Sequence, residues 1–169
     1  NKIILIDNAR NISIISNLKT IIQLYRLIKI EKYDIVHSHN HVIGVLTRIA
    51  AKLAGAPRIV HSPHGFYFHE NMPRHKYWFY FIIERCMGLI TDLIFIENSE
   101  NIEMCRTTHL ISENSLFYMG GGIDLSRFHG KKLSPKSRSL LMKNLNISQN
   151  AFPIIGITSR LTYEKGYGE

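Results

Sequence analysis

Cysteine is scarce in this sequence of 169 residues, which holds only Cys86 and Cys105. Both fall in segments with helical spacing, and they form neither a metal-ligand spacing nor a paired disulfide framework. A reduced, cytoplasmic chain is therefore the simpler interpretation.

Long apolar runs are also missing. The longest, residues 77–83, is far shorter than the roughly 20 residues that a membrane-spanning helix needs. The sequence shows no internal repeat, no low-complexity tract and no Gly-x-Gly-x-x-Gly after a first strand. With membrane-spanning, repeat and low-complexity classes excluded, the sequence has the pattern of a globular domain.

Acidic residues are fewer than basic ones, 13 against 21, and the net charge is +8. Such an excess suits an anionic partner, whether phosphate, a membrane surface or nucleic acid, and charge alone does not choose among them. The length suits one domain with a proper core. The chain opens almost directly onto a strand candidate and stops where a helix is expected to begin, so we interpret it as a fragment of a longer protein.

The most informative stretch is residues 32–68, which reads as strand, helix, strand. Residues 34–38 and 58–62 are short apolar runs, and residues 42–53 between them have apolar side chains at helical spacing. Gly55 and Pro57 end that helix. Such a unit predicts two parallel strands joined by a right-handed crossover.

The rest of the chain continues this alternation. Further strands are expected at residues 2–6, 91–97, 115–119 and 152–158, and further helices after an N-cap at Ser16, at 75–89, after an N-cap at Ser99, and at 136–146. The pattern predicts an α/β fold with a Rossmann-like, doubly wound parallel sheet. The last strand follows the only long connection without a pattern, so we place a domain boundary near Asn150.

Polar side chains gather where the predicted strands end. They are His37, His39, His64, Asn98, Ser99, Ser159 and Arg160. If the sheet is parallel, these residues share the carboxyl edge, where ligands of open α/β sheets bind.

His37, His39 and His41 alternate, and in a strand they would point the same way, as metal ligands at a strand end do. A hydrolytic metal site would also need carboxylates, and Glu97 is the only acid at the right edge. The alternative is that these histidines hydrogen-bond a neighbouring loop, and we favour that alternative.

His64 lies in the segment SPHGFYF, where Gly65 allows close approach of the backbone and the aromatic rings can wall a pocket. A neutral imidazole there can donate to a sugar hydroxyl or a carbonyl. A purely structural role in the turn is the alternative.

Arg160 and Lys165 flank a loop after the last predicted strand, ahead of an expected helix N-terminus. Two cations and free backbone donors suit a pyrophosphate, although such a loop can also be merely solvated. The glycines at 120–122 are interpreted as a turn between domains. The aromatic residues 77–83, preceded by three basic residues, suit either an anionic membrane surface or a core.

Five motifs in this order, YDIVHSHN, SPHGFYFHE, ERCMGLITDLIFIENSE, GGGIDLSRF and GITSRLTYEKGY, resemble family 4 of the glycosyltransferases. The resemblance is to the bacterial enzymes that build capsular polysaccharide, exopolysaccharide and lipopolysaccharide. It implies a GT-B fold, with residues 1–149 forming most of an acceptor-binding domain and residues 150–169 beginning the domain that binds the nucleotide sugar.

The resemblance also assigns roles to single residues. His64 matches a catalytic histidine near the donor sugar, and Arg160 and Lys165 match the pair that holds the donor pyrophosphate. The expected cleft residues are His37, His39, Gly65, Asn98 and Ser99, and the expected hinge residues are Gly122 and Asp124, with Phe128 in the same motif. Many members have asparagine where Gly121 stands here. The glycine-rich loop and the glutamate pair of the family lie outside this sequence, so the fragment alone is expected to be inactive or nearly so.

The implied reaction moves a sugar from a UDP- or GDP-linked donor to a glycan or lipid-linked acceptor with retention of configuration. It needs no metal or other cofactor, and it is expected in the cytoplasm or peripherally on the inner face of the plasma membrane, without nucleic acid. The alternatives are a metal-dependent hydrolase that uses the His-x-His strand end, a non-catalytic sugar- or nucleotide-binding module and, last, a nucleic-acid binder.

Overall fold

In the computed structural model, the described residues are 3–6, 13–127, 133–151, 153–154 and 156–161. The chain divides into two compact units, Asn1–Gly122 and Ile123–Glu169. The first holds the sheet, and the second holds a single described helix. The domain boundary expected near Asn150 lies within the second unit and stays a prediction.

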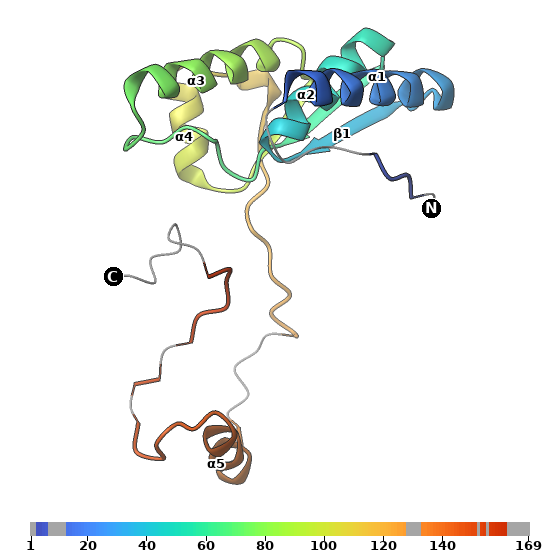
Figure 1. The fold of residues 1–169 in the computed structure, drawn as a ribbon. Helices are drawn as coiled ribbons and strands as arrows, with labels where there is room; N and C mark the ends of the chain where they lie inside the picture. The colour runs from blue at the N-terminus through green and yellow to red at the C-terminus, as the bar shows by residue number, and fades with distance from the viewer. Residues whose placement is uncertain (1–2, 7–12, 128–132, 152, 155, 162–169) are drawn as a thin grey trace. The chain divides into compact units, whose positions relative to one another are not determined.

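Strands and helices alternate through the first unit (Figure 1). The elements in chain order are α1 (Ile14–Glu31), β1 (Ile35–His39), α2 (His41–Ala54), β2 (Arg58–Ser62), α3 (Arg74–Gly88), β3 (Leu93–Ile96), α4 (Ser99–Thr107), a 3-10 turn (Glu113–Ser115) and β4 (Leu116–Tyr118), followed in the second unit by α5 (Pro135–Asn144). No helix among the described residues is long and apolar enough to cross a membrane.

The four strands form one parallel sheet in the order β1-β2-β3-β4. The parallel α/β sheet expected from the sequence is therefore confirmed. Its register brings strand ends together: His39, the last residue of β1, pairs with Ser62, the last residue of β2. Every carboxyl end lies at one edge.

One face of this sheet carries the buried core. Val36 pairs with Ile59, and Ser38 pairs with His61 two residues further along the same strands. All four side chains point to the same face and are buried. The helices α1 and α2, which lie along each other, close the core over this part of the sheet through Ile28 and a strip of alanines.

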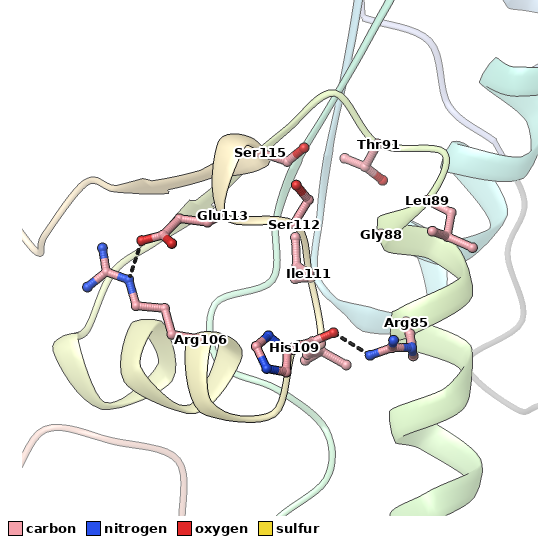
Figure 2. Close-up of a pocket in the computed structure, with 11 residues that line it drawn as sticks. Arg85, Gly88, Leu89, Thr91, Arg106, His109, Ile111, Ser112, Glu113 and Ser115 are labelled. Atoms are coloured by element: carbon pink, nitrogen blue, oxygen red, sulfur yellow. Dashed lines mark hydrogen bonds and ion pairs between the residues drawn. The ribbon is translucent and has the colours of Figure 1, made fainter.

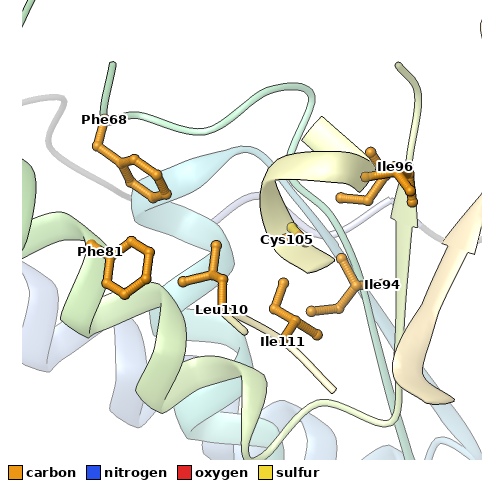
Figure 3. Packing of buried hydrophobic residues seen from close by; sticks show 8 residues of the cluster. Phe68, Phe81, Ile94, Ile96, Cys105, Leu110 and Ile111 are labelled. Carbon is orange, nitrogen blue, oxygen red and sulfur yellow. The ribbon is translucent and has the colours of Figure 1, made fainter. Parts of the chain in front are cut away.

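A second cluster continues the core over β3. Figure 3 shows side chains from β3, α3, α4 and the loops beside them packed together. The cluster comprises Phe68, Phe81, Ile94, Ile96, Ile102, Cys105, Leu110 and Ile111. Because Ile94 pairs with His61, this cluster lies on the same face as the first. The opposite face carries a row of aromatic rings, with His37 5.8 Å from Phe95 and Phe95 5.5 Å from Phe117 between centroids.

The helix ends follow local capping chemistry, and two caps differ from the expected ones. Helix α1 is capped by Ser13, whose hydroxyl accepts from the Ser16 amide, because the helix begins one turn earlier than expected. Helix α4 is capped by Asn98 rather than Ser99: the Asn98 side-chain oxygen accepts from the Asn101 backbone amide at 2.8 Å, and Ser99 is the first residue of the helix. Gly55 ends α2 as expected, in the left-handed conformation with φ +75°.

Two expected strands are wrong for the residues that the structure describes. Residues 3–6 are irregular, and Ile3 and Leu5 are exposed. In the segment 152–158, the described residues form no strand, while Phe152 and Ile155 lie outside the described residues. The physical reason is the same in both places, since an apolar run becomes a strand only when a neighbouring strand satisfies its backbone hydrogen bonds.

Candidate functional site

Two predicted site histidines meet at the carboxyl edge of the sheet. His39 ends β1 and His64 follows β2 by two residues. His39 Nδ1 lies 3.0 Å from His64 Nε2, and the rings are stacked with centroids 5.2 Å apart. Both side chains are exposed, so a ligand at this edge can reach them.

A third strand contributes Glu97, which directly follows β3. Its Oε1 lies 2.6 Å from His64 Nδ1, and about 40% of each side chain is exposed, 41% for His64 and 37% for Glu97. An ionised carboxylate only accepts hydrogen bonds, so it holds the proton of His64 on Nδ1. In the neutral ring, Nε2 then accepts from His39 Nδ1. The three side chains form a hydrogen-bonded chain across β1, β2 and β3.

From the sequence, Glu97 stood out only as an acid that a metal site would need. The signal that could have paired it with His64 was its position at the end of the neighbouring strand. Ser62 was missed as well: its hydroxyl lies 2.9 Å from His37 Nε2. A buried serine at the end of a strand has no distinctive sequence pattern.

The backbone at His64 is unusual. Its φ of +55° lies in the left-handed region, where residues other than glycine are uncommon, and Gly65 follows with φ +96°. Asn40 also has a positive φ, +63°, and its amide donates to the Ser62 carbonyl at 3.2 Å. The chain thus turns sharply past both strand ends, and the turn after β2 presents the His64 ring to both of its partners.

His37 belongs to the same group of rings. Its centroid lies 4.3 Å from that of His39. Burial lowers the pKa of His37, and the neighbouring His39 and His64 lower it further. The ring is therefore neutral at pH 7, and its Nε2 forms one hydrogen bond with the Ser62 hydroxyl.

His41 departs from the alternation because it begins helix α2. Its ring packs edge-on against Tyr67, with centroids 5.6 Å apart. In the part of the chain that the structure describes, no three His, Cys, Asp or Glu side chains are grouped so as to hold a metal ion. That the reaction needs no metal stays a prediction.

The other expected cleft residues lie at the same edge. Asn98 and Ser99 directly follow Glu97, and Gly65 follows His64. The Asn98 side chain is engaged in capping α4. Ser99 is exposed at the first turn of that helix.

The remaining predicted residues belong to other parts of the chain. Gly122 ends the first unit. In the second unit, the Asp124 carboxylate accepts from the Ser126 hydroxyl at 2.6 Å and from the Ser126 amide at 3.0 Å, and these hydrogen bonds lower the pKa of Asp124. Arg160 is exposed. Lys165 and Phe128 lie outside the described residues, so their assignments stay predictions.

Two pairs of buried polar side chains connect neighbouring elements of the first unit. Arg48 Nη2 donates to both carboxylate oxygens of Glu84 at 3.0 Å, tying α2 to α3 with almost no exposure of either side chain. His61 Nδ1 lies 2.9 Å from the Ser38 hydroxyl, tying β2 to β1. Burial, followed by the nearby Arg48 charge, lowers the pKa of His61 to about 3. These contacts hold α2 against α3 and β1 against β2, whose ends carry the candidate site.

A hollow of about 490 Å³ lies at the opposite edge, where β3 and β4 begin (Figure 2). Its two guanidinium groups already bind acceptors of the chain itself. Arg106 Nε lies 3.1 Å from Glu113, and Arg85 donates to the His109 carbonyl. Because ligands of parallel sheets bind at the carboxyl edge, this hollow is the weaker candidate.

The known proteins that this chain matches are described as glycosyltransferases. Residues 2–98 match a family described as "Glycosyl transferase 4-like". The chain is 34% identical to the UDP-Gal:alpha-D-GlcNAc-diphosphoundecaprenol alpha-1,3-galactosyltransferase of Escherichia coli, over 93% of this chain and 40% of that protein. It is 28% identical to the capsular polysaccharide biosynthesis glycosyltransferase CapM of Staphylococcus aureus, over 97% of this chain and 42% of that protein.

A solved structure agrees at the level of the fold. The crystal structure of a glycosyltransferase from Rickettsia africae ESF-5 covers 94% of this chain with a TM-score of 0.63 at 19% identity, and the chain covers 39% of it. The chain thus spans about two fifths of the length of the proteins that it matches.

Proposed function

The chain belongs to the glycosyl transferase 4-like family, and from that premise we propose that the full-length protein transfers a sugar from a nucleotide-sugar donor to a hydroxyl of a glycan or lipid-linked acceptor. The proposed reaction retains the anomeric configuration, needs no metal and serves the assembly of a cell-surface polysaccharide. Two curated relatives named as glycosyltransferases, one of them in capsular polysaccharide biosynthesis, support this assignment.

The observation that carries the proposal is the hydrogen-bonded chain of Glu97, His64 and His39 at the carboxyl edge. Because Glu97 holds the proton of His64 on Nδ1, His64 Nε2 is the atom that faces an incoming group. It can exchange its bond to His39 for a bond to a sugar hydroxyl. When Nε2 takes a proton, the Glu97 charge stabilises the resulting imidazolium. His64 is therefore the proposed catalytic residue.

Charge must also be stabilised on the departing diphosphate. The bond between the anomeric carbon and the phosphate oxygen breaks as the bond to the acceptor oxygen forms, which leaves negative charge on the nucleotide. Arg160 and Lys165 are proposed to bind that pyrophosphate through charge-assisted hydrogen bonds, each worth about 1.5–3 kcal/mol. The excess of basic over acidic residues agrees with such a partner.

The name of one relative points to the chemical class of the acceptor. The Escherichia coli relative is named for an acceptor in which a sugar is joined through a diphosphate to undecaprenol, so we propose a diphosphate-linked prenol sugar as the acceptor here. Such lipids lie in a membrane. Helix α3 opens with Arg74 and Lys76, and its exposed Trp78 and Phe79 could rest at the headgroup level of the cytoplasmic leaflet. No nucleic acid is expected to bind.

The test is a donor screen on the full-length protein. Each UDP- and GDP-linked sugar is incubated with a prenyl-diphosphate-linked sugar, and products are identified by mass. One donor should give a product one sugar heavier, with the anomeric configuration of the donor by NMR. Absence of transfer from every donor would contradict the proposal.

Arg160→Ala and Lys165→Ala should each lower kcat/KM by about 10- to 100-fold. Lys136→Ala, at an exposed position at the start of α5, serves as the matched control. Unchanged kinetics in the first two variants would reject the pyrophosphate assignment.

A further inference from the structure

A second pocket lies in the first unit beside the candidate site, between α1, α2, α3 and the loop after β2. Its volume is about 370 Å³, within the range of small-molecule sites. The walls are mainly hydrocarbon and aromatic. Val42, Val45 and Leu46 come from α2, Phe79 and Ile83 from α3, and Tyr67 from the loop. None of the residues proposed above for catalysis or for donor binding lines this pocket.

The pocket begins where the carboxyl edge ends. His41, in its wall, follows His39 by two residues, and Tyr67 follows His64 by three. Burial lowers the pKa of His41, and Arg48 and His64 lower it further, against the raising effect of the Glu84 carboxylate. The Tyr67 ring packs against His41 on one side and Tyr80 on the other, with a centroid distance of 4.5 Å to Tyr80. A molecule bound at the edge can thus extend into the pocket.

Two polar atoms at the wall lack a hydrogen-bond partner among the described residues. They are His41 Nδ1 and Asn17 Oδ1, and both are buried from solvent. A buried polar atom without a partner is unfavourable, so a bound group is expected to satisfy it. An imidazole N–H at His41 Nδ1 can donate to a phosphate oxygen, whereas Asn17 Oδ1 is an acceptor and suits a hydroxyl donor.

The Glu84 carboxylate also lines the pocket, and its buried ion pair with Arg48 neutralises it. Arg74 and Lys76 begin α3, and Lys76 is one helical turn before Phe79 in the pocket wall. The chain as a whole carries a charge of +8. An apolar cavity with a few polar atoms at its wall and basic residues nearby suits a ligand with an apolar tail and an anionic head.

On the basis of the lipid-linked acceptor argued above, we propose that this pocket binds the first isoprene units of a prenyl diphosphate. The diphosphate lies toward His41, and the acceptor sugar lies toward His39 and His64. The pocket would then select acceptors by their lipid and set how far the sugar reaches into the site.

Binding tests this without any sugar transfer. Isothermal titration of the full-length protein with farnesyl diphosphate and with inorganic diphosphate gives the contribution of the prenyl tail. We expect farnesyl diphosphate to bind at least about tenfold more tightly, because several methylene and methyl groups leave water. Equal affinities would overturn the proposal.

Four variants locate the tail. Val42→Trp fills the pocket from α2, and Phe79→Ser removes part of its wall on α3; both positions are partly exposed, at 43% and 60%, so the core is not disturbed. Each should reduce the preference to within about twofold. The matched controls Leu53→Trp and Ile82→Ser, on the same two helices but outside the pocket wall, should keep the preference.

The outcomes separate this proposal from the proposed function. If Val42→Trp and Phe79→Ser keep the tenfold preference, or if the controls lose it equally, the pocket does not bind the tail, even when sugar transfer is observed. If the preference depends on the pocket but no donor is used, the prenyl site stands and the transferase assignment fails. Circular dichroism of each variant checks that it is folded before titration.

Discussion

His39 Nδ1 and His64 Nε2 share a hydrogen bond of 3.0 Å, although 25 residues separate them in the sequence. The parallel register of β1 and β2 produces this contact, since His39 pairs with Ser62 and the chain turns sharply after it. Glu97, at the end of the next strand, determines which nitrogen of His64 carries the proton.

Replacing His64 should affect catalysis more than folding. His64→Asn is the suitable variant because asparagine tolerates the left-handed φ of +55° at this position. We expect kcat/KM of the full-length protein to fall by about 10²- to 10⁴-fold, because the proton-holding ring at the edge is lost. The midpoint of thermal unfolding should change little.

The matched control is His69→Asn, at an exposed histidine of the same loop. A second variant, Glu97→Gln, keeps an acceptor for Nδ1 but removes the charge, so its loss should be smaller than that of His64→Asn. If His64→Asn only unfolds earlier and keeps its turnover, His64 has a structural role.

The sequence predicted much of this edge because the relevant signals are local. The apolar runs around His37 and His61, the helix ended by Gly55 and the polar residues after each strand were enough to expect a parallel sheet with histidines at one edge. Residues 58–62 were predicted as a strand with the bounds that β2 has.

What the sequence could not give depends on contacts between distant residues. The pairing of Glu97 with His64 requires the strand order, and the burial of Arg48 against Glu84 requires the packing of α2 on α3. The apolar residues 3–6 look like a strand, but nothing in their own sequence says whether a neighbouring strand is present.

The buried pair of Arg48 and Glu84 predicts a large effect on stability. Glu84→Leu leaves the Arg48 guanidinium buried without its counter-charge, which should cost about 3–5 kcal/mol in the free energy of unfolding. Denaturant titration measures it. The exposed pair of Arg58 and Asp92, at 3.4 Å, supplies the comparison: Arg58→Ala should cost no more than about 1 kcal/mol.

A double variant tests the mechanism of that loss. Arg48→Met combined with Glu84→Leu removes both charges and fills the space with apolar atoms, so it should recover a large part of the stability. If the double variant is as unstable as Glu84→Leu alone, the unpaired charge is not the cause.

The buried His61 predicts a dependence of stability on pH. Its pKa is about 3 in the folded protein, against about 6.5 in an unfolded chain. Between these values the unfolded state binds more protons, so the stabilisation from the neutral ring is complete above about pH 6.5 and is lost as the pH falls toward 3. Each pH unit in this window should cost up to about 1.4 kcal/mol.

Urea unfolding at pH 7, 6, 5 and 4 measures this slope. His61→Gln cannot titrate, so its free energy of unfolding should fall less steeply than that of the unaltered protein, even if it is less stable at pH 7. Parallel curves for the two proteins would show that His61 does not stay neutral in the folded state.

Gly44 faces the same ring from helix α2. A Cβ at this position would lie 2.5 Å from His61 Cε1, and the ring is held in place by Ser38 at 2.9 Å. Gly44→Ala should therefore destabilise the protein by about 1–3 kcal/mol through overpacking, less the gain of up to about 1 kcal/mol that alanine gives within a helix. Gly121→Ala, where the added methyl meets open space, should change stability little.

In a His61→Ala background the clash disappears, so Gly44→Ala should cost nothing there or even stabilise the protein. Equal costs in both backgrounds of this double-mutant cycle would rule out contact with the ring as the reason for glycine at this position.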